Sequence, residues 1–284
     1  MQTEKISLVI FTCEGREHLI HDTLNTFKEA CSYSFHQTIL AIDGTISTPI
    51  LDFVQPDLVV QSPVRKGYVH NILQALNAVE TNYFFWLEDD WHFPVKIPVD
   101  HFQRLLGSPD VLQVVLSKFD LNNSFTEYED NYYIQRDGFS ANPGICKTAL
   151  IKAGFERIKE AKKDQTTQLV GFETSLNEYA KANGLITLKY ISDNKATVYH
   201  SGELESTARE YHMINSLNEA QSLINKQYIS GFGFDKKIRA RNKVSMLLKL
   251  WKATFLLSFR LWSFRDAYDF AFRIYLGSLK KFKN

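Results

Sequence analysis

The chain has 284 residues, of which 44% are hydrophobic and 23% charged, so it can bury a substantial core in one or two domains. This composition excludes a disordered chain, a collagen-like repeat and a disulfide scaffold. The net charge of +1 hides a division, because residues 231–284 contain 13 basic and 3 acidic side chains, whereas residues 1–230 contain 20 basic and 29 acidic ones. An acidic body is therefore joined to a strongly basic tail.

The first half of the chain alternates between two hydrophobic periods. Three-and-four spacing of apolar residues predicts helices at residues 18–30 and 67–79. Short apolar runs predict buried strands at residues 6–12, 38–42, 58–61, 83–87 and 111–116. Strands that alternate with helices predict an α/β fold, with a mostly parallel central sheet flanked by helices.

The pattern is looser after this region. Residues 122–137 are polar and aromatic, and we interpret them as loops or as an excursion from the main fold. The later elements that we predict are helices at residues 148–153 and 170–183 and strands at residues 186–191 and 196–199.

Polar clusters follow three of the predicted strands, at residues 12–16, 43–45 and 88–90. In open α/β sheets, ligands bind beyond the carboxyl ends of the strands. The consecutive carboxylates of residues 88–90 repel one another unless a cation offsets their charge, and oxygen ligands suit Mg²⁺ or Mn²⁺. A solvated acidic turn is the alternative, but the place after a buried strand favours a metal site.

Residues 65–91, RKGYVHNILQALNAVETNYFFWLEDDW, resemble the central stretch of family 2 glycosyltransferases, which have the GT-A fold. In that family a glycine precedes a helix opened by an asparagine, and a hydrophobic strand then runs into a D-x-D metal motif. Gly67 and Asn71 match the first two features, and residues 88–90 match the motif. Residues 9–13 resemble the first strand of the family, and Arg16 and Leu19 fall where Arg and Leu are common in it. Residues 42–45 resemble its D-D-G-S element, with Ile42 in place of the first Asp.

The resemblance implies roles for residues on the donor side of the site. The residues that would contact the nucleotide-sugar donor are Thr12, Arg16, Asp43, Gly67, Asn71, Glu88 and Asp89. Asp90 and Glu88 would bind the metal, joined by His200, which resembles the later metal-binding histidine of many GT-A enzymes. An imidazole ligand favours Mn²⁺ over Mg²⁺.

Two further segments imply an acceptor side and a catalytic base. Residues 144–155 resemble an element in which a glycine-containing loop precedes a helix, which places Gly144 on the acceptor side. Trp91, directly after the acids, is either a second acceptor contact or a core residue. Residues 171–176, GFETSL, resemble the G-E-D-x-x-L segment, so Glu173 would be the catalytic base. Without the resemblance, Glu173 is equally typical of a solvated first turn of a helix.

These features together imply a metal-dependent, inverting, hexosyltransferase-like glycosyltransferase. It would move a sugar from a nucleotide-sugar donor to a glycan or lipid-linked acceptor in cell-surface polysaccharide or glycan synthesis. Two other classes stay open. A nucleotidyltransferase would share the acidic metal site, although residues 12–16 are a poor phosphate loop. A catalytically silent, membrane-bound binding module would need neither Glu173 nor a metal.

We divide the chain into a GT-A catalytic domain at residues 1–230 and a basic, aromatic-rich helical tail at residues 231–284. Basic residues of the tail fall on one helical stripe, and Trp251 and Trp262 lie among the apolar residues beside it. This pattern predicts helices lying on an anionic membrane surface. Helices packed on the catalytic domain, or on the second subunit of a homo-oligomer, are the alternative. The sequence has no recognisable nucleic-acid-binding module, so nucleic acid is not an expected partner.

The sequence also carries an expectation about location. Three cysteines without metal-type spacing are typical of a reducing compartment. The chain begins without a long apolar signal-peptide core, and no segment reaches the ~18 consecutive apolar residues that span a bilayer. We therefore expect a cytoplasmic protein, held peripherally at the inner face of the membrane through its tail.

Overall fold

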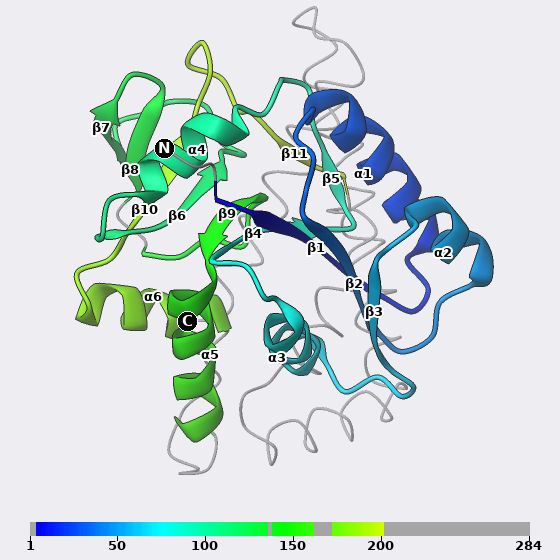
Figure 1. The fold of residues 1–284 in the computed structure, drawn as a ribbon. Coiled ribbons are helices and arrows are strands. Elements are labelled where there is room, and N and C mark those ends of the chain that lie inside the picture. Colours follow the sequence, from blue (N-terminus) through cyan, green and yellow to red (C-terminus); the bar gives the residue numbers. More distant parts are fainter. Residues whose placement is uncertain (1–3, 136–137, 162–171, 202–284) are drawn as a thin grey trace, which may run out of the picture. The chain divides into compact units, whose positions relative to one another are not determined.

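The computed structural model describes residues 4–135, 138–161 and 172–201 (Figure 1). The predicted basic tail lies outside these residues. No helix in the described ranges is long and apolar enough to cross a bilayer.

One large sheet organises the described part of the chain, with nine strands in the order β3-β2-β1-β4-β9-β6-β10-β8-β7. The strands are β1 Ile6–Cys13, β2 Gln37–Asp43, β3 Leu58–Ser62, β4 Tyr83–Glu88, β6 Val111–Leu116, β7 Phe125–Glu129, β8 Tyr132–Gln135, β9 Gly144–Lys147 and β10 Ile186–Tyr190. All of them except β8 and β9 run in one direction. This topology confirms the predicted α/β class with a largely parallel central sheet.

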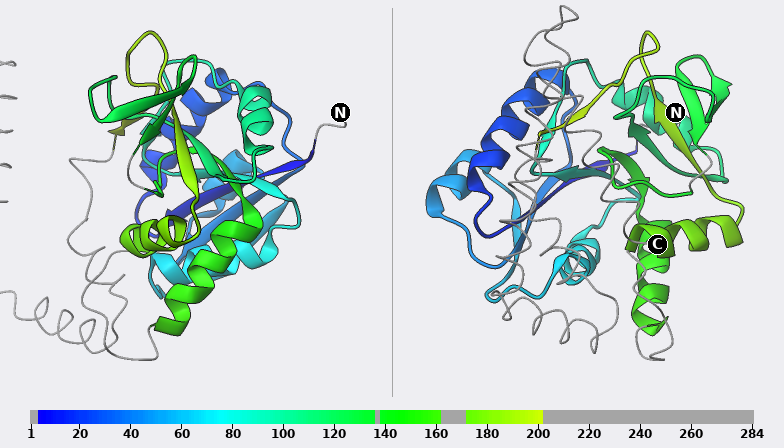
Figure 2. Two further views of the ribbon diagram at one scale, coloured as in Figure 1. Left: turned by 90° about the vertical axis from the view of Figure 1, so that its left-hand side faces the viewer. Right: turned by 180° about the vertical axis from the view of Figure 1, so that it is seen from behind.

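Helices cover both faces of the sheet (Figures 1 and 2). They are α1 Glu17–Ala30, α2 Thr48–Val54, α3 Tyr68–Ala78, α4 Val99–Leu106, α5 Thr148–Ala161 and α6 Phe172–Ala182. Residues of α1, α2 and α4 belong to one buried apolar cluster, and residues of α3, α5 and α6 belong to a second. The central strands therefore bury both faces, which explains why their sequences are continuous apolar runs rather than alternating ones.

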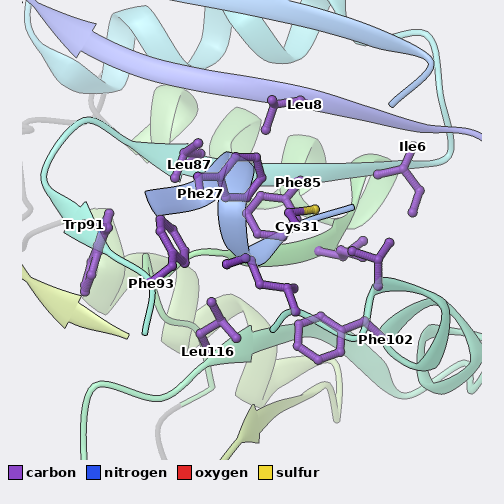
Figure 3. Close-up of a cluster of buried hydrophobic side chains, with 14 of the residues drawn as sticks. Ile6, Leu8, Phe27, Cys31, Phe85, Leu87, Trp91, Phe93, Phe102 and Leu116 are labelled. Carbon is purple, nitrogen blue, oxygen red and sulfur yellow. The ribbon is translucent and has the colours of Figure 1, made fainter. Parts of the chain in front are cut away.

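Strand β4 shows how the two clusters share the sheet. Phe85 and Leu87 join the first cluster, whereas Phe84 and Trp86 join the second, as the alternation of a strand requires. In the first cluster, Phe27 of α1 packs beside Phe85 of β4 and beside Phe93, as Figure 3 shows. Its ring centroid lies 5.2 Å from that of Phe85 and 5.3 Å from that of Phe93. This aromatic packing fixes α1 against the end of β4.

The structure corrects two predictions in the middle of the chain. Residues 122–137 were interpreted as loops, but they contain the hairpin β7–β8, which adds to the edge strand β10. Strand β7 keeps exposed or half-exposed polar side chains, and β8 is only four residues long, so neither has the apolar run of a buried strand. The turn uses Asn131 at φ 65°, a left-handed conformation that asparagine tolerates.

The second correction concerns Gly144, which was placed in a loop. It begins β9, an antiparallel strand inserted between β4 and β6. A Cβ atom at this position would lie 2.3 Å from the carbonyl oxygen of Val114, so the close approach of β9 to β6 requires glycine.

Smaller elements also differ from the predictions. Helices α2 and α4 and the short strand β5 Trp91–His92 were not predicted. Of the last predicted strand, at residues 196–199, only residue 199 lies in a strand, which is β11 Tyr199–His200 and pairs antiparallel with β5. Two-residue strands fall below the length at which a hydrophobic period can be read. Their pairing nevertheless brings His200 beside the end of β4.

Candidate active site

The three consecutive carboxylates at the end of β4 do not share one environment. Glu88, the last residue of the strand, faces α3, and the Tyr68 hydroxyl donates a hydrogen bond to its carboxylate. Asp89 lies on the α1 side, where it accepts hydrogen bonds from Arg16. Asp90 follows in the turn before β5. Directing the side chains apart reduces the repulsion that three adjacent negative charges would otherwise cause.

Asp89 is a buried carboxylate held by several donors. The Thr12 hydroxyl donates to Oδ2 at 2.6 Å, and Arg16 Nε lies 2.9 Å from Oδ1 and 3.1 Å from Oδ2. The Thr23 hydroxyl donates to the Asp89 carbonyl at 2.7 Å and accepts from the Trp91 N–H at 3.0 Å. The structure thus brings together Thr12, Arg16 and Asp89, which the sequence analysis named as donor contacts, and adds Thr23, which it missed.

Glu88 and Asp89 carry raised pKa values. Burial raises the pKa of Asp89 to about 6, although the Arg16 guanidinium acts to lower it. Burial, followed by the negative charges of Asp90 and Glu173, raises the pKa of Glu88 to about 8, against the hydrogen bond from Tyr68. A cation placed near these groups would favour their charged forms.

Asp90 and His200 come together through the pairing of β5 with β11. The Ser201 N–H donates to the Asp90 carbonyl at 2.8 Å, and His200 Nε2 lies 3.3 Å from Asp90 Oδ2. Arg16 Nη2 lies 2.5 Å from the same oxygen. Asp90 Oδ1 and His200 Nδ1 are buried and have no hydrogen-bond partner. A buried carboxylate oxygen without a partner is costly unless another ligand satisfies it.

Asp90 and His200 fit a divalent cation whose remaining ligands are water and substrate oxygens. Among the described residues no group of three or more His, Cys, Asp or Glu side chains is arranged to hold a metal by itself. Mg²⁺ and related ions commonly bind through one or two carboxylates and complete their shell with water and substrate phosphates. Asp90, with one fixed and one unpartnered oxygen beside His200, matches that pattern.

Asp43 organises the turn after β2. Its carboxylate accepts the Lys66 N–H at 2.7 Å and the Gly67 N–H at 3.1 and 3.2 Å, which ties β2 to the start of α3. Gly67 has φ 95° and Gly44 has φ 104°, so both need the left-handed freedom of glycine. Asp43 is 3% exposed, and its hydrogen bonds go to backbone groups of this chain.

Asn71, a buried residue of α3, connects this helix to β1 and β2. Its amide nitrogen donates to the carbonyl oxygens of Ala41 at 3.1 Å and Thr12 at 3.5 Å. These contacts connect α3 to the carboxyl ends of β2 and β1. The predicted donor-side residues therefore meet at one edge of the sheet, around the ends of β1, β2 and β4.

Glu173 lies in the first turn of α6 and is exposed. Its Oε1 accepts the Ala141 N–H at 3.1 Å. The preceding residue, Phe172, packs its ring 5.4 Å from that of Tyr68 and 5.9 Å from that of Phe155. Tyr68 also donates to Glu88, so one aromatic contact links the end of β4 to the start of α6. Tyr68 was not singled out from the sequence.

The two predicted acceptor-side residues are both buried. Trp91 is 3% exposed and packs edge-on against His200, with ring centroids 4.7 Å apart. Gly144 lies within the sheet, as described above. A contact of either residue with an acceptor stays a prediction, and the structure places Trp91 as a support beneath His200.

No protein-family model and no curated protein matches this sequence. Solved structures do match it. The mannosyltransferase PcManGT from Pyrobaculum calidifontis, in complex with GDP-Man and Mn²⁺, is 15% identical with a TM-score of 0.50, covering 68% of this chain and 56% of its own. GalNAc-T7 with UDP, GalNAc and Mn²⁺ is 9% identical with a TM-score of 0.51, covering 75% of this chain and 48% of its own.

The chain has a GT-A fold. It spans about half the length of the two structures it matches. Within this fold, the Glu88–Asp90 triplet lies at the carboxyl end of β4, at the edge of the sheet where α/β folds bind ligands.

The contacts of Arg16 predict a large stability effect. We expect Arg16→Met to lower the free energy of unfolding by about 3 kcal/mol, because it leaves two buried carboxylates without their guanidinium partner. Urea denaturation measures the loss.

Arg65→Met is the matched control, since Arg65 is exposed and its Nε lies 3.9 Å from Asp43. It should cost less than about 1 kcal/mol. Equal losses in the two variants would show that the Arg16 bridge does not stabilise the site.

Proposed function

We propose that this chain is a metal-dependent, inverting glycosyltransferase that uses a nucleotide-sugar donor. The observation that carries this proposal is Asp90, at the end of β4 in a GT-A fold. One of its oxygens is fixed by Arg16 and approached by His200, and the other is buried without a partner. PcManGT and GalNAc-T7, which share the fold, are complexes with Mn²⁺ and a nucleotide or nucleotide sugar, and this supports the same ligand classes here.

Asp90 and His200 would hold Mn²⁺ or Mg²⁺, with Glu88 as the further predicted ligand. When bound, the metal would neutralise the charge of the diphosphate leaving group. The chain itself prepares this site. Arg16 anchors Asp90, and the β5–β11 pairing holds His200 beside it, so the two side chains are positioned before a ligand binds.

The donor would lie across the ends of β1, β2 and β4. Asp43, Gly67 and Asn71 shape this edge, because they tie the β1 and β2 ends to α3. Thr12 and Arg16 contribute through Asp89, whose carboxylate they hold. We infer that these residues position the nucleotide and its phosphates mainly by fixing the backbone around them.

Glu173 would be the catalytic base. Its carboxylate is exposed at the start of α6, and the Ala141 N–H fixes one of its oxygens. An exposed carboxylate can accept the proton of an acceptor hydroxyl while that oxygen attacks the anomeric carbon. Attack from the side opposite the leaving diphosphate inverts the configuration at that carbon.

We further propose a glycan or lipid-linked acceptor, a role in cell-surface polysaccharide or glycan synthesis, and a peripheral location on the inner face of the membrane. The support is the sequence of the tail, which combines 13 basic residues with interspersed aromatic ones. Basic, aromatic-rich helices bind anionic lipid surfaces, so the tail would hold the catalytic domain near a membrane-associated acceptor.

Removal of the Asp90 charge tests the metal role. We expect Asp90→Asn to lower Mn²⁺-dependent hydrolysis of UDP-GlcNAc or GDP-Man by at least about 10²-fold, because a metal contributes several kcal/mol of charge stabilisation. The same variant should lose the rise in melting temperature that Mn²⁺ and UDP or GDP together produce in the wild-type chain.

Asp22→Asn, an exposed change on α1, is the matched control and should behave as wild type. Full activity and an unchanged melting shift in Asp90→Asn would exclude Asp90 as a metal ligand.

A second variant tests the base. Glu173→Gln keeps the shape of the side chain but cannot take a proton, so we expect turnover to fall by about 10²–10⁴-fold with unchanged affinity for UDP and GDP. Steady-state kinetics and calorimetric titration measure the two quantities.

Glu178→Gln, on an exposed position of the same helix, should leave both unchanged. Wild-type turnover in Glu173→Gln would refute the base assignment. Absence of turnover in the wild-type chain with a panel of nucleotide sugars would instead favour a binding module.

The tail proposal is tested on the full chain. Replacing Trp251 and Trp262 with Ala should weaken sedimentation with vesicles of phosphatidylglycerol and phosphatidylcholine by roughly tenfold per residue, given about 1.5–3 kcal/mol for each buried apolar side chain. Phe119→Ala, an exposed aromatic in the described part of the chain, should not change sedimentation. If the Trp variants sediment as the wild type does, the tail does not bind the vesicles through these residues.

A further inference from the structure

Strand β10 carries a buried lysine in the middle of the sheet. Lys189 is 3% exposed, and the residues before it on the same side of the strand include Thr187, which is fully buried. Between them, Leu188 turns to the opposite face and joins the first apolar cluster. Burial of an ammonium group is costly and calls for specific polar partners.

The partners lie in residues 138–142, the segment that leads into β9. Lys189 Nζ donates to Ser140 Oγ at 2.6 Å, and the Thr187 hydroxyl donates to the Gly138 carbonyl at 2.5 Å. Gln113 of β6, also fully buried, donates from Nε2 to the Ser140 carbonyl at 2.9 Å. Gln113, Thr187 and Lys189 thus form a polar trio that holds residues 138–142 from the sheet side.

Helix α6 holds the same segment from the other side. The Phe139 N–H donates to the Asn177 side-chain oxygen, and the Ala141 N–H donates to Glu173 Oε1 at 3.1 Å. Glu173 and Asn177 are four residues apart, so they lie on one face of the helix. Backbone groups of an extended chain point alternately to opposite sides. Here the carbonyls of Gly138 and Ser140 meet the polar trio, whereas the N–H groups of Phe139 and Ala141 meet α6.

We propose that Lys189 is a positioning residue for Glu173. It fixes the Ser140 hydroxyl and therefore the adjacent Ala141 N–H, which holds the Glu173 carboxylate in place to accept a proton. An apolar side chain of similar length would fill the same space but could not donate to Ser140. This inference rests on the proposed function, because it assigns Glu173 its role as base.

The test compares Lys189→Met with Lys147→Met, its matched control. Lys147 Nζ donates to the Ser108 carbonyl at 2.5 Å and belongs to the same sheet, but it is not one of the groups that hold residues 138–142. We expect Lys189→Met to lower kcat for hydrolysis of UDP-GlcNAc or GDP-Man by roughly tenfold with KM unchanged, since misplacement of a reacting group costs rate rather than donor affinity. Lys147→Met should leave kcat unchanged.

A double-mutant cycle separates positioning from general damage. In the Glu173→Gln background, Lys189→Met should cause no further loss of kcat, because its effect passes through Glu173. A tenfold loss in both backgrounds, or an equal loss in Lys147→Met, would overturn the inference. If Lys189→Met does not fold, Ser140→Ala removes the same Oγ contact from the other partner and should show the same dependence on Glu173.

Hydrogen–deuterium exchange of the ligand-free chain supplies a readout that does not need turnover. We expect faster exchange of the Phe139 and Ala141 amides in Lys189→Met, and unchanged exchange in Lys147→Met. Unchanged exchange with normal kcat would refute the role of Lys189 and leave the proposed function standing. Faster exchange in a chain without any sugar-transfer or hydrolysis activity would support the Lys189 contact and refute the proposed function instead.

Discussion

The arrangement of the donor side depends on one guanidinium group. Arg16 contacts both Asp89 and Asp90, which are buried at the end of β4. Without a cation between them, two adjacent buried carboxylates would favour protonation or exposure, and the β4–β5 turn could not keep its path. Arg16 directly precedes α1, and Thr23 of that helix also holds the turn. The position of α1 therefore determines the geometry of Asp89 and Asp90.

The sequence predicted this side well for a physical reason. The parallel strands β1, β2 and β4 are buried on both faces, so their continuous apolar runs were visible, and polar residues directly after them marked the ligand-binding edge. The polar clusters at residues 12–16 and 43–45 were therefore visible from their place, whereas the donor roles of Thr12, Arg16 and Asp43 came from the family resemblance. Their actual partners were not predictable, because pairings such as Arg16 with Asp89 join residues far apart in the chain.

The side that carries Glu173 was harder to predict. Strand β9 is four residues long and needs Gly144 for its close approach to Val114, and in the β7–β8 hairpin β7 keeps exposed polar side chains while β8 is only four residues long. Neither produces the pattern of a buried strand. Lys189 shows the difficulty most clearly. A lysine in a short strand indicates a solvent-facing position, but Lys189 is buried and donates to Ser140, 49 residues earlier.

Both sides of the site contain buried polar side chains, but of different kinds. On the β4 side, an excess of carboxylates is offset by Arg16 and still leaves Asp90 Oδ1 without a partner, which suits an incoming cation. On the β10 side, the buried Lys189 donates to the Ser140 hydroxyl, and the carboxylate it supports, Glu173, remains exposed for a proton. Tyr68 joins the two, because it donates to Glu88 while its ring packs on Phe172 beside Glu173. A change in the packing of this one ring should therefore affect the metal side and the base side together.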